Sequence, residues 1–141
     1  MLTYKNILYA TTKIISENFD CDVIVENQEG IFKDECFYVS ITPTNSTAST
    51  RATNQKQLII SVKYFSNNSI NHYDVANKLE LLFARNIKVK DRMLNISSIE
   101  PNFLEDEIGD MLDFLIYINY IDEVHIDKDT FELMNDIDIK N

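Results

Sequence analysis

Side chains capable of acid–base or metal chemistry are abundant in this sequence, but their spacing does not predict a catalytic site. The acidic run Glu105–Glu107 has no histidine beside it, and acid–base catalysis needs a carboxylate with a shifted pKa and a nearby partner. The acidic residues around Asp127 lack the glycine and the spacing of a calcium-binding loop. His72 and His125 are far apart, and we expect each at the surface or half-buried. We therefore predict no catalytic residue, no metal ligand and no cofactor.

The glycine and cysteine residues also give no indication of a catalytic site. The chain has two glycines, Gly30 and Gly109, which excludes a dinucleotide-binding loop, a P-loop and a nucleophile elbow. Cys21 and Cys36 are expected on neighbouring strands, where a disulfide is geometrically possible. In a reducing compartment, free buried thiols are favoured over that bond.

Charge is distributed unevenly along the 141 residues. Residues 1–103 contain 11 acidic and 11 basic side chains, whereas residues 104–141 contain 12 acidic and 2 basic ones and carry the whole net charge of −10. An acidic surface repels nucleic acid, so we expect no specific nucleic-acid binding. Such a region would serve as a solvated surface, as a contact for a basic partner, or as the lining of a passage through which DNA moves without binding.

The sequence also predicts a cytoplasmic protein. No apolar run approaches the roughly 18 residues that a membrane span needs. Lys5 and Lys13 interrupt the apolar N-terminal stretch, which therefore differs from a secretory signal.

Two segments have the apolar spacing of amphipathic helices. Residues 3–19 and 71–86 place apolar side chains at intervals of three and four, so one face of each helix is expected to pack on a core. The first stripe comprises Tyr4, Ile7, Leu8, Thr11, Ile14, Ile15 and Phe19, and the second comprises Val75, Ala76, Leu79, Leu82 and Phe83.

The first strands are predicted from β-branched and aromatic residues. The segments CDVIVE and ECFYVSIT are expected to form an antiparallel hairpin with Gly30 in the turn. The segment QLIISVKYF alternates between an apolar face and a mixed face, as on a sheet that is covered on one side only.

Residues 42–57, which we call the arm, separate two of these strands. The segment TPTNSTASTRATNQKQ has no glycine and few apolar residues, whereas a tight hairpin would need two to five residues with Asn-Gly or Asp-Gly chemistry. Its threonines favour extended backbone. We expect the flanking strands to continue into a projecting hairpin, whose tip is ordered by a neighbouring molecule.

The last strands are predicted in the same way. We expect a small hairpin that turns at Lys90–Arg92, and Pro101 indicates an edge or a kink. Gly109 lies where a final hairpin would need positive φ. The segment DMLDFLIYINYI is apolar on both faces except for Asp113 and Asn119, which predicts a central strand covered by helices or by another subunit.

These elements predict an α+β fold with two helices packed on a mainly antiparallel sheet and a projecting hairpin arm. We expect a single domain over residues 1–122 and an acidic C-terminal extension over residues 123–141.

Several short sequence segments and the order of the predicted elements resemble the tail terminator proteins of long-tailed phages and phage-tail-like particles. The segments KVKDRMLNI and EDEIGDMLDFLIYINY resemble the C-terminal half of that family, and STRATNQKQLIISVKYF resembles its arginine-bearing segment before a strand that ends in Tyr-Phe. The resemblance covers roughly residues 3–122. The family turn tends to read Asp-Gly-Val-Leu, whereas this chain has Ile108-Gly109-Asp110-Met111-Leu112, and nothing past residue 122 matches.

The resemblance implies a structural protein without catalytic activity. Such proteins form a ring, usually hexameric, on the head-proximal end of the tail tube. The ring stops tube polymerisation and meets a connector, or caps a headless contractile, bacteriocin-like particle. The implied partners are further copies of the chain, tube protein, sheath protein and a connector. The chain would reside in the cytoplasm during assembly and then in the particle. Alternatives are a head–tail connector or other tail completion protein, a small immunity-type or regulatory binding module, and an enzyme with an unrecognised site.

Charge and position suggest five residues that could contact another subunit or partner. Thr50, Arg51 and Lys56 lie on the arm, Arg92 at a hairpin tip and Asp113 on an otherwise apolar strand. Plain solvent exposure explains each residue equally well, so these assignments remain hypotheses.

Overall fold

A computed structural model describes residues 2–25, 35–66, 69–106 and 109–123. In chain order the elements are α1 (Tyr4–Asn18), β1 (Asp22–Val25), β2 (Glu35–Ala48), β3 (Thr53–Ser66), α2 (Ser69–Leu82), β4 (Asn86–Val89), β5 (Arg92–Asp106) and β6 (Gly109–Glu123). Both expected helices and the α+β class are confirmed. The turn at Gly30, His125 and residues 124–141 lie outside the described residues.

The strands form one six-stranded sheet in the order β1-β2-β3-β6-β5-β4. All neighbouring pairs are antiparallel except β1 and β2. Strand β6 is central, as its two apolar faces predicted. The expected antiparallel hairpin of β1 and β2 is wrong, because Asp22 lies opposite Cys36 and Val25 opposite Val39 in parallel register. Alternation shows which side chains share a face, but it carries no information on strand direction.

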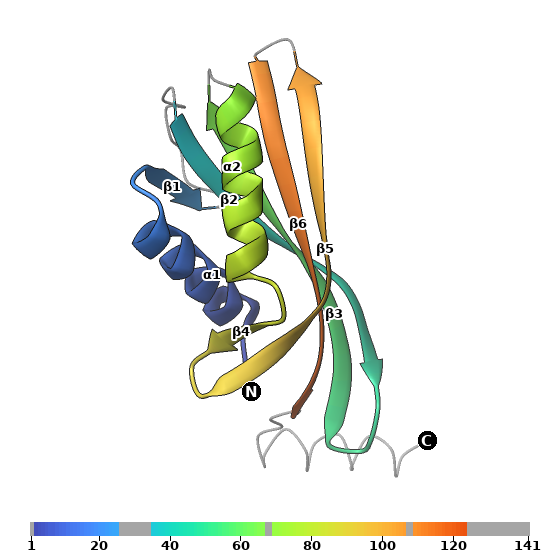
Figure 1. The fold of residues 1–141 in the computed structure, drawn as a ribbon. Coiled ribbons are helices and arrows are strands. Elements are labelled where there is room, and N and C mark those ends of the chain that lie inside the picture. The colour runs from blue at the N-terminus through green and yellow to red at the C-terminus, as the bar shows by residue number, and fades with distance from the viewer. Residues whose placement is uncertain (1, 26–34, 67–68, 107–108, 124–141) are drawn as a thin grey trace.

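Both helices lie on the same face of the sheet (Figure 1). Helix α1 contacts β1 and β2 and also β4, although β1 and β4 end the sheet at opposite sides. The sheet therefore curls around α1. Helix α2 packs on β3, β5 and β6. Thr3 caps the start of α1 by accepting a hydrogen bond from the backbone N–H of Asn6, whose side chain accepts one from the backbone of Thr3, a reciprocal capping arrangement.

Strand β5 changes partner along its length. Its first residues pair with β4, and those from Ile96 onward pair with β6, with a bulge between Ile96 and Ser98. Beyond Ile96 its outer side has no strand neighbour in the described part of the sheet, so Pro101 lies on a free edge, as predicted. Proline is tolerated there because an edge can dispense with one N–H donor.

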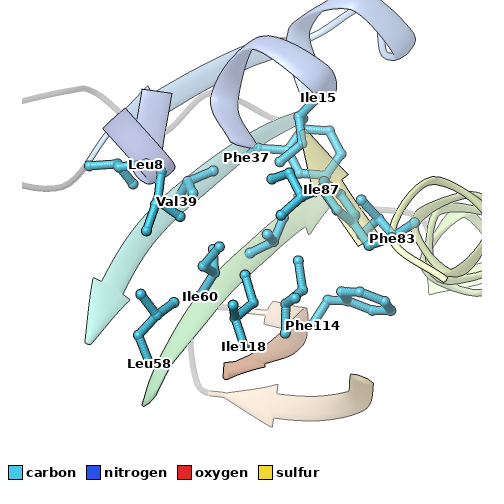
Figure 2. Packing of buried hydrophobic residues seen from close by; sticks show 14 of the residues in the cluster. Leu8, Ile15, Phe37, Val39, Leu58, Ile60, Phe83, Ile87, Phe114 and Ile118 are labelled. Carbon is cyan, nitrogen blue, oxygen red and sulfur yellow. The ribbon is translucent and has the colours of Figure 1, made fainter. Parts of the chain in front are cut away.

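The core lies between the helices and the sheet (Figure 2). Even-numbered residues of β3 and β6 point into it, whereas their odd-numbered neighbours point to the opposite face. The apolar side chains that are fully or nearly fully buried include Ile7, Ile15, Phe37, Val39, Leu58, Ile60, Val62, Leu79, Phe83, Leu112, Phe114, Ile116 and Ile118. Period-two burial on the strands and helical spacing on α1 and α2 thus converge on one core.

His72 differs from the expectation of a surface or half-buried histidine. It is buried in the first part of α2, and its ring meets the Tyr64 ring edge-on with 5.5 Å between centroids. Its Nε2 has no hydrogen-bond partner among the described residues. Its position follows from the helical stripe, since residue 72 precedes the buried Val75 and Ala76 by three and four positions.

Candidate partner interface

The arm is a continuous β-hairpin that projects beyond the helices (Figure 1). Strand β2 extends to Ala48 and β3 begins at Thr53, which confirms that the flanking strands continue into it. Strand β6 pairs with β3 along the whole arm, as far as Thr53, which lies opposite Glu123. The three strands make this part of the sheet stiff, because β3 is hydrogen-bonded on both sides.

Threonine side chains shape the tip of the arm in place of glycine. The backbone N–H groups of Ser49 and Thr50 both donate to the Thr53 carbonyl oxygen, at 3.0 and 3.1 Å. The hydroxyls of Thr50 and Thr53 lie 2.5 Å apart, and Ala52 N–H donates to the Thr50 hydroxyl at 3.3 Å. Thr50 is therefore occupied in holding the turn.

Arg51 is the free charge of the arm. It is exposed at the tip and has no ion-pair partner within the described residues. Residues 42–57 contain two basic side chains, Arg51 and Lys56, and no acidic one. The residues of the arm itself are therefore positively charged on a chain of net charge −10, and the exposed Glu123 of β6 lies opposite Thr53 beside the tip.

A buried carboxylate on β6, opposite Asn54 near the tip of the arm, ties this part of the sheet to the N-terminus. Asp122, only 2% exposed, accepts a hydrogen bond from the Leu2 backbone N–H at 2.9 Å. Its other oxygen pairs with Arg92 Nη1 at 2.8 Å, and Arg92 Nη2 donates to the Ile121 carbonyl oxygen at 2.6 Å. Arg92 thus begins β5 rather than lying at a hairpin tip, and its guanidinium is engaged within its own chain.

Aromatic rings surround this carboxylate. Lys56 Nζ lies 5.3 Å from the centroid of the Tyr4 ring, and the Arg92 guanidinium lies 6.0 Å from that of Tyr120, distances at which cations attract the ring face. Burial raises the pKa of Tyr120 to about 12. Its hydroxyl has no hydrogen-bond partner in the described part of the chain.

The sheet face opposite the helices carries alternating apolar and polar side chains. Asp113 accepts a hydrogen bond from the Ser61 hydroxyl at 2.6 Å and lies opposite Lys63 in the β3–β6 register. The Tyr117 hydroxyl donates to Glu100 at 2.9 Å, and this hydrogen bond raises the pKa of Tyr117. No described helix or strand covers this face.

A groove lies between α2 and β5, at the free edge of the sheet. Asn77, Glu80, Leu81 and Ala84 line its helix side, and Ile99 lines its strand side. Leu81 is 82% exposed, which is unusual for so apolar a side chain in a helix. Elsewhere on the same two elements Tyr73 stacks on Phe103 with 4.9 Å between ring centroids, and both rings are exposed. This surface is therefore apolar and uncovered.

The cysteine thiols and the Tyr64 hydroxyl are chemically reactive groups, but their surroundings are those of structural residues. Cys21 and Cys36 are not joined in a disulfide, and burial raises the pKa of Cys21 to about 11. Burial and the hydrogen bond that Tyr64 donates to Glu35 at 2.6 Å raise the pKa of Tyr64. Over the described ranges, no three His, Cys, Asp or Glu side chains are grouped so as to hold a metal ion. No described helix is long and apolar enough to cross a membrane.

The five suggested residues therefore fall into three places. Thr50 and Arg51 form the arm tip, Lys56 and Arg92 lie along the side of the arm where β6 runs, and Asp113 lies on the uncovered sheet face. Sequence reasoning missed Asp122, although a signal existed. It continues the even-numbered series of buried residues on β6, so its carboxylate falls at a core position and needs a partner.

Comparison with known families matches residues 6–130 to the phage tail terminator protein family. The match continues past residue 122, where the sequence patterns had suggested no counterpart. No curated protein matches the chain. A solved structure without a descriptive name is 13% identical, with a TM-score of 0.55 over 91% of this chain and 100% of the other. That likeness concerns the fold alone.

Proposed function

This chain belongs to the phage tail terminator protein family, and we propose that it forms a ring on the head-proximal end of a tail tube. The ring stops tube polymerisation and offers its other side to a connector, or closes a headless particle. Tail terminators are structural components of the tail, so the chain acts through contacts with other subunits and without catalysis.

The single observation that supports a ring best is the arm. A hairpin backed by a third strand presents the exposed Arg51 away from its own subunit, where that side chain has no described partner. The surfaces left uncovered, the groove beside α2 and the sheet face with Asp113, are different from the arm. Contacts between unlike surfaces are heterologous, and they generate a closed ring when the rotation between subunits closes.

Charge supports the same proposal. A net charge of −10 keeps free subunits apart by repulsion. Assembly then requires local positive charge at the contact, which the arm carries. We propose that acidic residues from the segment 104–141 line a passage that DNA can traverse without binding.

The proposal is tested by light scattering together with negative-stain electron microscopy of the purified chain. We expect a discrete oligomer, a hexamer in the simplest case, seen as a ring with a central hole. A stable monomer at high concentration that does not bind tube or sheath protein would contradict it and favour a small binding module. A ring that binds a head-side connector but never tube protein would favour another tail completion role.

A further inference from the structure

The groove between α2 and β5 has features that match the arm tip. Leu81, Ala84 and Ile99 give it an apolar lining, and Glu80 adds a carboxylate to that lining. Glu80 is exposed and has no ion-pair partner among the described residues. An unpaired carboxylate beside exposed apolar surface is complementary to a side chain that has an apolar stem and a positively charged head.

Arginine is such a side chain. Its methylene stem covers apolar surface while its guanidinium meets a carboxylate in a bidentate manner. In the arm, Lys56 is already placed over the Tyr4 ring. Arg51 is therefore the cation that remains available.

The nearby charges favour the same contact. Asp74 on α2 and Glu105 on the outer part of β5 are also acidic and exposed. No partner is seen for Asp74 or Glu105 in the described part of the chain, whereas Glu100 lies on the opposite sheet face and accepts a hydrogen bond from Tyr117. An acidic surface on an acidic protein repels copies of itself, and it attracts the arm, whose own charged residues are Arg51 and Lys56.

We infer that the arm tip of one copy docks in the α2–β5 groove of the next copy, with Arg51 paired to Glu80 above Leu81 and Ile99. The inference rests on the proposed ring and names the surface that receives the arm. In one chain the two surfaces do not meet, so the contact joins different copies. The arm is held by β6 along β3, so little conformational freedom is lost when it docks.

Charge exchange tests this pairing. Arg51→Glu places two carboxylates together, and Glu80→Arg places two cations together. Each change should raise the protein concentration needed for ring formation by about tenfold or more, because like charges at a contact are strongly unfavourable. The double variant Arg51→Glu/Glu80→Arg restores the opposite charges and should assemble within about threefold of the unmodified chain.

Matched controls exist on α1. Lys13 and Glu17 are exposed and 4.0 Å apart, so Lys13→Glu and Glu17→Arg change the net charge by the same amounts at another place. All variants are measured by light scattering and electron microscopy, with circular dichroism to establish that each subunit is folded.

The outcomes separate the inference from the proposed function. Weak assembly of both single variants, recovery in the double variant and unaffected controls would support the pairing. Rings that form normally in either single variant, or a double variant that fails to recover, would overturn the pairing while the ring itself stands. An unmodified chain that forms no ring would overturn both.

Discussion

At the residue scale, the main polar feature is the carboxylate of Asp122, which holds three parts of the chain together. It lies near the end of β6, binds the backbone of Leu2 before α1, and pairs with Arg92 at the start of β5. A buried carboxylate is stable only when it is paired and hydrogen-bonded. One side chain thus fixes the end of β6, which runs beside the arm, to the N-terminus.

We predict that Arg92→Ala lowers the free energy of unfolding by about 3 kcal/mol, since it leaves the Asp122 carboxylate with one less charged partner in a buried site. Urea unfolding followed by circular dichroism measures this. Arg85→Ala provides the control, because Arg85 is exposed and should cost less than about 0.5 kcal/mol. An equal, small loss in both variants would show that the ion pair contributes little.

The second residue-scale prediction concerns Tyr120. Its buried hydroxyl has no described partner, so Tyr120→Phe should raise the free energy of unfolding at pH 7 by about 1 kcal/mol. The folded pKa of about 12 exceeds the ordinary value of 10.0. Between these pH values the unfolded chain loses the proton while the folded chain keeps it, so stability falls as pH rises through that window.

Urea unfolding at pH 7 and across pH 9–12 tests both parts of this prediction. The fall above pH 10 should be smaller in Tyr120→Phe but not absent, because the pKa of Tyr64 and that of Cys21 are also raised. A loss of stability at pH 7 in Tyr120→Phe would show that the hydroxyl is satisfied in solution.

Sequence reasoning identified charged residues but not their partners. Arg92 and Asp113 were recognised as unusual, yet the partners of both lie on distant strands, Asp122 and Ser61. Pairing across 30 and 52 positions depends on the strand register, which one sequence does not specify. The burial of His72 and of Asp122, in contrast, follows from helical and strand periodicity.

At the element scale, β6 is the strand whose two faces differ most in their surroundings. Ile116 is fully buried under the helices, whereas the adjacent Leu115 is half-buried on the uncovered face. We predict that Ile116→Ala lowers the free energy of unfolding by about 2–5 kcal/mol through lost burial and cavity formation. Leu115→Ala should cost about 1 kcal/mol, because less contact is removed.

Denaturant unfolding of dilute, unassembled chain measures both variants and keeps ring contacts out of the comparison. Similar large losses would show that another part of the chain covers the second face in solution.

Elements were more predictable than their pairing. The helices, the central strand, the turn before β5 and the extension of β2 and β3 into the arm all follow from periodicity and β-propensity. The parallel pairing of β1 with β2 does not, because both directions bury the same side chains. The groove also needed the tertiary structure, since its lining combines Leu81 of α2 with Ile99 of β5.

At the scale of the whole molecule, the proposed ring requires an acidic subunit to join copies of itself in one direction only. The arm and the α2–β5 groove are unlike surfaces of opposite charge, which favours head-to-tail contacts over symmetric dimers. Free edges on β2 and β5 could instead pair strand to strand, yet the chain's two prolines, Pro43 and Pro101, lie on these edges. Proline hinders such pairing, so side-chain docking is the favoured contact.

Growth of tail tubes in the presence of this chain tests the central claim most directly. The tube protein of the same phage or phage-tail-like particle is polymerised with and without the chain, and tube lengths and ends are recorded by electron microscopy. We predict shorter tubes, each with a ring-shaped density at one end, and a tube length that falls as more of the chain is added. Tubes of unchanged length without end density, or with the chain bound along their sides, would contradict the account.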